Sequence, residues 1–191
     1  MTGRTHDLTA ITLLNIVFIS QSLIHTTLST VFVAVGANLI GGLVPDIDQP
    51  TADLWRRIPG GSIIGRIISP LLGSHRMISH SFAGIVIFGF LSMKFFDAIS
   101  SVVLVDMILV WFAFMIGFIS HILIDLITKE GEPLLFPLPF KVGIPPFQFL
   151  RIKTGGFIEK SIIFPGLMLT NGYIIYFHYT KYLEFLTILA K

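Results

Sequence analysis

The sequence predicts an all-α, polytopic membrane protein with about five transmembrane helices and two long cytoplasmic loops rich in proline and glycine. Of its 191 residues, 53% are hydrophobic and only 13% are charged, whereas a soluble domain carries roughly 25% charged residues. The mean hydropathy is +0.85. Such a chain needs an apolar solvent around it as well as an apolar core, and its length suits a single domain, residues 1–191.

The transmembrane prediction rests on long apolar runs, because a spanning helix needs about 20 apolar residues. The runs cover about 8–24, 27–44, 82–96, 102–128 and 161–180, with 189 as an alternative end of the last one. A polar interruption between the first two runs, 21–27, predicts a tight turn between two spans. The first run resembles a signal peptide, but no cleavage site of the A-x-A type follows it, so we expect a retained helix.

Two polar stretches, 45–80 and 129–160, are dense in proline and glycine, which indicates loops without long helices. Loops of this length are usually functional or disordered. Basic residues give the orientation. With the N-terminus inside, ten Lys and Arg residues fall in the inner segments and three in the outer ones. This bias explains the net charge of +2. We therefore expect membrane lipids as partners and no direct nucleic-acid binding. The predicted location is a membrane, with the N-terminus on the cytoplasmic side.

On this topology, potential metal ligands from distant segments gather at the inner membrane face. They are His6, Asp46, Asp48, His75, His80, His121, Asp125 and Glu159. The chain has no cysteine, so a metal site must use His, Asp and Glu, which suits zinc, manganese or iron. His25 and His178 fall on the other side and are read as interfacial residues.

His121 and Asp125 stand four residues apart in the fourth run, so they share one helix face. An ionisable residue in a spanning helix is a functional candidate by default, and the alternative is a structural hydrogen-bonded pair. Asp46 and Asp48 follow the second run. If their segment is extended, both carboxylates point the same way and could hold or bridge metal ions. The alternative is a solvated turn.

The third run begins after His75, Arg76 and His80. Neutral histidines are good metal ligands, and Arg76 could clamp a phosphate beside a helix N-terminus. The alternative is an interfacial loop with Ser79 or Ser81 as the N-cap. Glu159 opens the last helix, where it could also serve only as a partner of the helix dipole. His6 lies in a terminal segment of a kind that is often disordered.

Taken in order, these motifs resemble the YdjM family of inner-membrane metal-dependent hydrolases, also labelled LexA-binding. The matching pieces are Thr5-His6, 43–50, 75–81, 117–125, 131–137 and 155–159. The chain departs from the family pattern at Gln49, where His is common, at 77–79, where Gly-x-Thr is common, and at 128–129, where Thr-Pro is common. None of these departures removes a predicted ligand.

The family also looks distantly similar to zinc-dependent phospholipase C enzymes. That resemblance implies phosphoester hydrolysis with two or three zinc ions, held by an early His, an Asp, a further His, a His-x-x-x-Asp pair and a late Glu. The matching residues here are His6, Asp46 or Asp48, His80, His121 with Asp125, and Glu159.

We therefore expect a metal-dependent hydrolase, with a phosphoester as substrate, at the cytoplasmic membrane face. It would hold one to three divalent ions, zinc or alternatively manganese. Asp46 or Asp48, whichever is not a ligand, is the expected general base. Arg76 is expected to stabilise developing charge, and Glu159 is expected to complete the site. The substrate would be a lipid or lipid-linked phosphoester. The alternatives are a non-enzymatic membrane anchor for a LexA-type regulatory protein and a metal or proton transporter.

Overall fold

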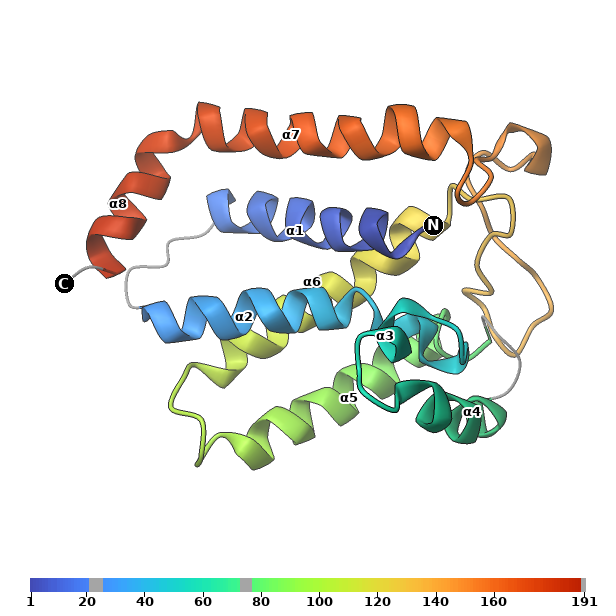
Figure 1. Cartoon of the computed structure of the whole chain (residues 1–191), viewed down its shortest axis with the longest axis horizontal. Helices are drawn as coiled ribbons and strands as arrows, with labels where there is room; N and C mark the ends of the chain where they lie inside the picture. The colour runs from blue at the N-terminus through green and yellow to red at the C-terminus, as the bar shows by residue number, and fades with distance from the viewer. Residues whose placement is uncertain (21–25, 73–76, 190–191) are drawn as a thin grey trace.

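The computed structural model describes residues 1–20, 26–72 and 77–189, and its long helices run lengthwise along the molecule (Figure 1). These helices are α1 (Gly3–Ser20), α2 (Leu28–Gly41), α5 (Phe82–Ile99), α6 (Met107–Asp125) and α7 (Phe164–Phe177). The shorter elements are η1 (Val44–Asp48), α3 (Asp53–Arg56), α4 (Gly61–Leu72), η2 (Gln148–Leu150), η3 (Glu159–Ile163) and α8 (Tyr179–Leu189). The all-helical prediction is confirmed for this part of the chain.

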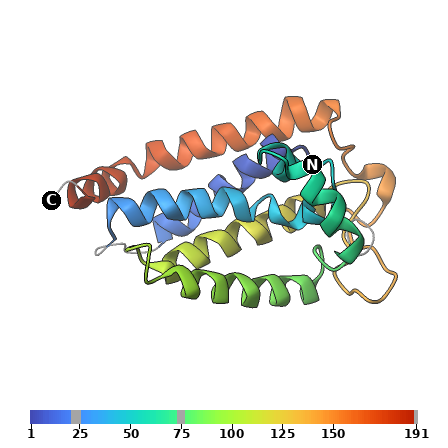
Figure 2. The same cartoon turned by 60° about the horizontal axis from the view of Figure 1, so that its bottom comes forward.

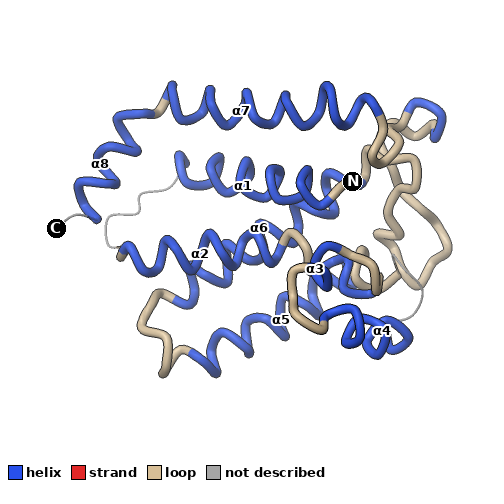
Figure 3. The backbone as a smooth tube through the Cα atoms, viewed as in Figure 1, coloured by secondary structure: helices blue, strands red, loops and turns tan. Residues whose placement is uncertain are grey.

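Helix α6 forms the centre of the bundle. It packs against α1, α2 and α5, and α7 covers α1 from outside (Figures 1 and 2). The core lies between α2 and α6 and consists of Ala34, Ala37, Val110, Ala113, Phe114, Met115, Phe118 and Ile122. Most of the loop structure gathers at one end of the bundle, where α2 and α6 end and α5 begins (Figure 3). That end holds most of the residues singled out from the sequence.

Helices α2 and α6 approach closely because glycines stand at their contact. A Cβ at Gly117 would collide with the carbonyl oxygen of Asn38, and one at Gly41 would collide with that of Phe114. Asn38 is fully buried, and its amide donates to the carbonyl of Ala113 over 3.0 Å. Small residues at a helix contact allow this separation in membrane proteins.

Several predicted boundaries are right and others are wrong. Helix α5 begins after Ser81, whose hydroxyl accepts from the amide of Gly84, so Ser81 is the N-cap of the two serines considered. Helix α6 begins only after the N-cap Asp106, so residues 102–106 do not belong to it. The last run does not continue as one helix to 189, because the chain breaks at His178 between α7 and α8.

The stretch 45–80 was expected to lack long helices, yet it contains η1, α3 and the 12-residue α4. Proline and glycine stand near the two ends of α4. Gly60 precedes it with φ of +71°, a value that glycine adopts readily, and Pro70 falls in its last turn. The composition therefore marked where this helix begins and ends.

Helices α5 and α6 are long and apolar enough to cross a membrane, while α2 is apolar but has only 14 residues. Within the described residues, α1 and α7 do not meet the same test, so the count of five spans is not confirmed. Threonine and asparagine side chains on α1 lower its hydropathy, among them Thr9, Thr12 and Asn15. Large apolar side chains still cover the outside of the bundle, including Phe32, Val86 and Leu169, which are 70%, 71% and 75% exposed.

Candidate metal centre

Histidine and carboxylate side chains from several segments meet at the loop-rich end of α6. They are His6 of α1, Asp46 of η1, His80 ahead of α5, His121 and Asp125 of α6, and Glu132 of the following loop. Three groups have all their ligand atoms within 4.8 Å of one another: His6 with His121 and Asp125, Asp46 with His80 and His121, and His80 with Asp125 and Glu132. All of these residues except Asp46 are buried, and Asp46 is partly buried.

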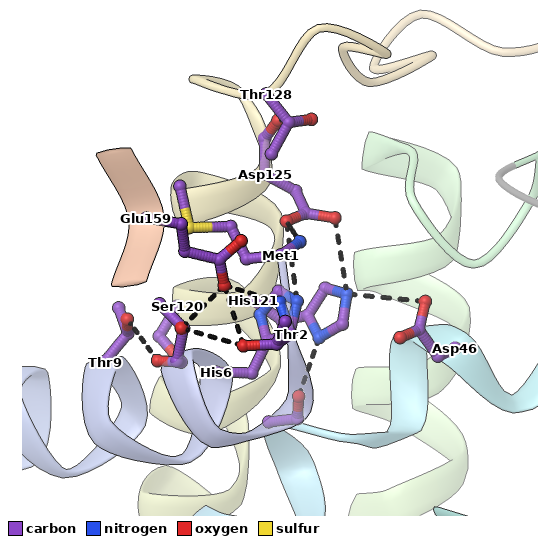
Figure 4. Close-up of polar contacts among 12 residues, drawn as sticks. Met1, Thr2, His6, Thr9, Asp46, Ser120, His121, Asp125, Thr128 and Glu159 are labelled. Carbon is purple, nitrogen blue, oxygen red and sulfur yellow. Dashed lines mark hydrogen bonds and ion pairs between the residues drawn. The ribbon is translucent and has the colours of Figure 1, made fainter. Parts of the chain in front are cut away.

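His121 lies at the middle of this cluster (Figure 4). Its Nε2 atom is 3.6 Å from Asp46 Oδ1, 3.9 Å from Asp125 Oδ2 and 3.4 Å from Nε2 of His80. The ring of His6 stacks on that of His121 with 3.6 Å between centroids. Nε2 of His6 lies 3.4 Å from Asp125 Oδ1, which the amino group of Met1 also contacts. The polar atoms of α1, η1, α6 and the segment ahead of α5 thus point into one small volume.

The outer nitrogens of His121 and His80 have partners that orient the rings. Nδ1 of His121 lies 2.7 Å from the carbonyl oxygen of Gly42, which can only accept, so Nδ1 carries the proton. The Ser79 hydroxyl donates to Asp48 over 2.9 Å and lies 2.9 Å from Nδ1 of His80, from which it therefore accepts. In both rings this leaves the Nε2 lone pair directed into the cluster. Metal-binding histidines are held in this way in proteins.

This arrangement fits a divalent cation. Two Nε2 lone pairs and the Asp46 carboxylate face one another at 3.4 and 3.6 Å, and they repel unless a positive charge lies among them. Ligand atoms bound to one tetrahedral zinc at 2.0–2.1 Å stand about 3.3 Å apart, close to these separations. Within the described residues, neither ring nitrogen of the buried His6 makes a hydrogen bond. A proton on Nε2 of His80 or His121 would relieve part of this repulsion, but it would not provide a hydrogen bond for His6.

The charge state of Asp46 suits a ligand. Burial raises the pKa of its carboxyl group, but His121 and His80 beside it, when their rings are protonated, have the larger combined effect and hold the pKa well below its usual range. The group is therefore an anion at neutral pH. It also borders a cavity of about 270 Å³, which is lined among others by Thr51, Asp53 and Arg56.

The predicted site residues divide into three sets. His6, Asp46, His80, His121 and Asp125 come together in the cluster. Asp48 is buried behind His80 as the acceptor for Ser79, and Glu159 lies to one side of the cluster. His75 and Arg76 lie outside the described residues, so their predicted roles as ligand and phosphate clamp stay predictions.

Glu159 is surrounded by donors from two segments that lie far apart in the sequence. Its Oε1 accepts from the amide and hydroxyl of Thr2 and from the hydroxyl of Thr5, each over 2.7 Å. Its Oε2 accepts from the amide of Gly155 over 2.6 Å. Both oxygens are thus engaged in fastening the start of α1 to the start of η3, beside the metal groups rather than within them.

The expectation that Asp46 and Asp48 point the same way from an extended segment is wrong. Residues Val44–Asp48 form a 3₁₀ helix, in which the amide of Asp46 bonds to the carbonyl of Leu43 and the amide of Gln49 bonds to that of Asp46. In this helix, residues two apart lie on different sides. Asp46 consequently faces the histidines, while Asp48 faces Ser79.

The sequence interpretation missed Glu132 as a candidate ligand. The residue is fully buried, and its backbone pairs with Val142 through bonds of 2.7 and 2.8 Å. Gly131 precedes it with φ of +64°. A lone glutamate in a stretch rich in proline and glycine reads as solvated, and only the recurrence of Gly131-Glu132-Pro133 among the family motifs could have singled it out.

An all-helical chain with an apolar outer surface and a buried histidine–carboxylate cluster defines a class of membrane-embedded, candidate metal-binding proteins. Residues 1–185 match the family model described as "YdjM inner membrane protein". The chain therefore belongs to the YdjM family, which confirms the family resemblance stated from its motifs.

Pairwise comparison with individual proteins agrees with this family assignment. The chain is 31% identical to YvsG of Bacillus subtilis over 139 residues, which cover 72% of this chain and 74% of YvsG. It is 32% identical over 130 residues to the inner membrane protein YdjM of Escherichia coli, covering 63% of this chain and 56% of that protein. The YdjM protein of Shigella flexneri gives the same values. The match thus spans little more than half of the two YdjM proteins, and no solved structure matches the chain.

Proposed function

We propose that this chain is a membrane-bound, metal-dependent hydrolase that cleaves a phosphoester at the cytoplasmic membrane face. The observation that carries the proposal is the mutual approach of His80, His121 and Asp46, with each histidine held so that its Nε2 lone pair faces the others. A divalent cation bound among these atoms would relieve their mutual repulsion. Zinc is the first choice of ion and manganese the second, because the ligands are nitrogen and carboxylate oxygen.

The residues have separate roles in this proposal. His80, His121 and Asp46 would hold one ion, and Asp125 offers a ligand for a second, either with His6 and His121 or with His80 and Glu132. Bound there, a divalent ion would polarise the phosphoryl group and lower the pKa of water. Asp48 and Ser79 orient His80, and the cavity beside Asp46 admits the polar part of the substrate. Arg76 keeps its proposed role of stabilising negative charge on phosphate.

The orientation also belongs to this proposal. Ten basic residues in the predicted inner segments against three in the outer ones favour a cytoplasmic N-terminus and five spans. The metal groups would then lie at the inner face, since Asp125 is the last residue of α6 and His80 lies two residues ahead of α5. A transporter places its polar residues near the middle of the membrane, so this end position favours an interfacial enzyme over a transporter.

A hydrolysis assay tests the proposal. Protein purified in detergent should cleave an aryl phosphodiester or a phospholipid, lose this activity with a chelator, and regain it with zinc or manganese. His80→Ala should abolish the activity, whereas His178→Ala, on the far side of the bundle, should retain it. Failure of metal-loaded protein to cleave any member of a broad phosphoester panel would remove the hydrolase proposal, and a metal-binding anchor would remain.

A further inference from the structure

A long apolar groove lies between α2 and α5, with α6 as its floor. Both helices pack on α6 rather than on each other, which leaves a space of about 490 Å³ between them. The lining residues are Val33, Gly36, Ala37 and Ile40 from α2, Phe88, Leu91, Ser92, Phe95 and Phe96 from α5, and Phe114 from α6. Ser92 is the one polar side chain in this lining. The groove therefore suits an elongated hydrocarbon and offers almost nothing to a polar ligand.

The groove runs toward the metal groups. Helices α2 and α5 run in opposite directions, so Ile40 and Phe88 mark one end of it, while Val33 and Phe95 mark the other (Figure 1). The rise of a helix places Val33 about 10 Å from Ile40 along the axis.

Ile40 is followed within two residues by Gly42, whose carbonyl holds His121. Phe88 contacts Phe118 with 5.4 Å between ring centroids, and Phe118 stands one helical turn before His121. One end of the groove thus adjoins the residues that frame the site.

We infer that the groove binds an acyl chain of a membrane lipid, so that the phosphoester cleaved at the metal groups belongs to a lipid. The inference rests on the proposed function, to which it adds the place in the fold where the acyl chain of a lipid substrate binds. One wall of the groove, α5, and its floor, α6, are the helices that are long and apolar enough to span a membrane, so the occupant reaches the groove directly from the bilayer. An acyl chain that lies along the groove has its polar end beside Asp46 and His80. Asp46 follows Ile40 in the sequence, and His80 precedes Phe88.

Gly36 provides a way to close the groove. Gly36 lines the groove, and a Cβ at this position would meet nothing within 4 Å, so a larger side chain can begin there without displacing the backbone. Gly172 of α7 has the same open surroundings on a different helix and is the matched control. Gly36→Phe and the smaller Gly36→Leu are the two test variants, and Gly172→Phe is the control, each checked for unchanged thermal unfolding.

Lipid binding is measured first, because it does not depend on catalysis. Protein in vesicles of phosphatidylethanolamine and phosphatidylglycerol is irradiated with a phosphatidylglycerol that carries a diazirine in its acyl chain, and adducts are mapped by mass spectrometry. Adducts on Phe88 and Leu91 should exceed those on Leu169 of α7, which is 75% exposed and reports ordinary surrounding lipid. Gly36→Phe should reduce the groove adducts by about tenfold, and Gly172→Phe should not.

Catalysis gives the second arm. For a long-chain phospholipid, Gly36→Phe should raise KM by about tenfold, while cleavage of a short, water-soluble phosphodiester stays as in the unaltered protein. Equal effects on both substrates would overturn the acyl-chain assignment but leave the hydrolase proposal intact. Groove adducts without any hydrolysis would support the acyl-chain assignment and remove the hydrolase proposal. Unchanged adducts together with an altered oligomeric state in Gly36→Phe would assign the groove to a second copy of the chain and overturn the inference.

Discussion

The surroundings of single side chains decide which of the predicted ligands can act together. His121 was recognisable from the sequence because a histidine and an aspartate four residues apart must share a helix face. Its carbonyl partner, Gly42, comes from another helix and has no signal in the sequence. Asp46 and Asp48 were equivalent in the sequence, and only the 3₁₀ turn of η1 separates them. Glu132 was missed because its burial depends on pairing with Val142, ten residues further along the chain.

Ser79 should matter to metal binding without touching the metal. Ser79→Ala removes the hydroxyl that holds Nδ1 of His80, and loss of such an outer partner lowers metal affinity by about 10- to 100-fold. Competition with a chelator of known affinity measures the change. Ser92→Ala, on α5, is the control and should bind metal as the unaltered protein does. Equal affinity in the Ser79 and Ser92 variants would contradict the role given to Ser79.

Glu159 should contribute to stability in a pH-dependent way. Burial raises the pKa of its carboxyl group, but donors from Thr2, Thr5 and Gly155 outweigh burial and lower the pKa below its ordinary value of 4.5. A depressed folded-state pKa stabilises the protein above the ordinary value, and this stabilisation is lost as the pH falls through the folded-state pKa.

Glu159→Gln should therefore unfold more easily at neutral pH, by about 2 kcal/mol, and the difference should shrink in acid. Denaturant unfolding in detergent, at neutral pH and in acid, measures this difference in stability. Glu184→Gln, at an exposed position, is the control. A difference between Glu159→Gln and the unaltered protein that is the same at both pH values would show that the carboxylate charge is not responsible.

At the scale of elements, the contact between α2 and α6 connects the fold to the site. Glycines at this contact let Gly42 reach His121, so packing in the bundle determines the direction of a ligand. The apolar runs predicted the existence of the long helices, because hydrophobicity along the chain is a local property. Their ends were less predictable. Apolar residues 102–105 lie outside α6 because Asp106 caps the helix after them, and a cap can override the apolar pattern.

Gly117→Val should weaken both packing and metal binding. The new side chain would collide with the carbonyl of Asn38 and with the amide of Gly42, so α2 must move away from α6. We expect a loss of about 1–3 kcal/mol in unfolding free energy and a weaker hold on metal, because the Gly42 carbonyl moves with α2. Unfolding and chelator titration measure the two effects. Gly172→Val, at an open position on α7, should change neither, and a stable Gly117→Val with full metal affinity would refute this coupling.

At the scale of the whole molecule, the distribution of basic residues predicts the orientation in the membrane. The chain has no cysteine, so single cysteines can be introduced without background labelling. Arg57→Cys and Lys153→Cys should react with a membrane-impermeant maleimide only from the cytoplasmic side, and Lys181→Cys only from the outside. Labelling of Arg57→Cys from the periplasm would reverse the orientation and move the metal groups to the other membrane face.

We propose that His6, Asp46, His80, His121, Asp125 and Glu132 form a metal centre. Elemental analysis of the detergent-purified protein tests it most directly. We predict at least one tightly held zinc or manganese ion per chain, most of it lost in His121→Ala and retained in His178→Ala, with all three proteins inserted in the membrane. A metal content in His121→Ala equal to that of the unaltered protein, or no bound divalent ion in the unaltered protein, would contradict the account.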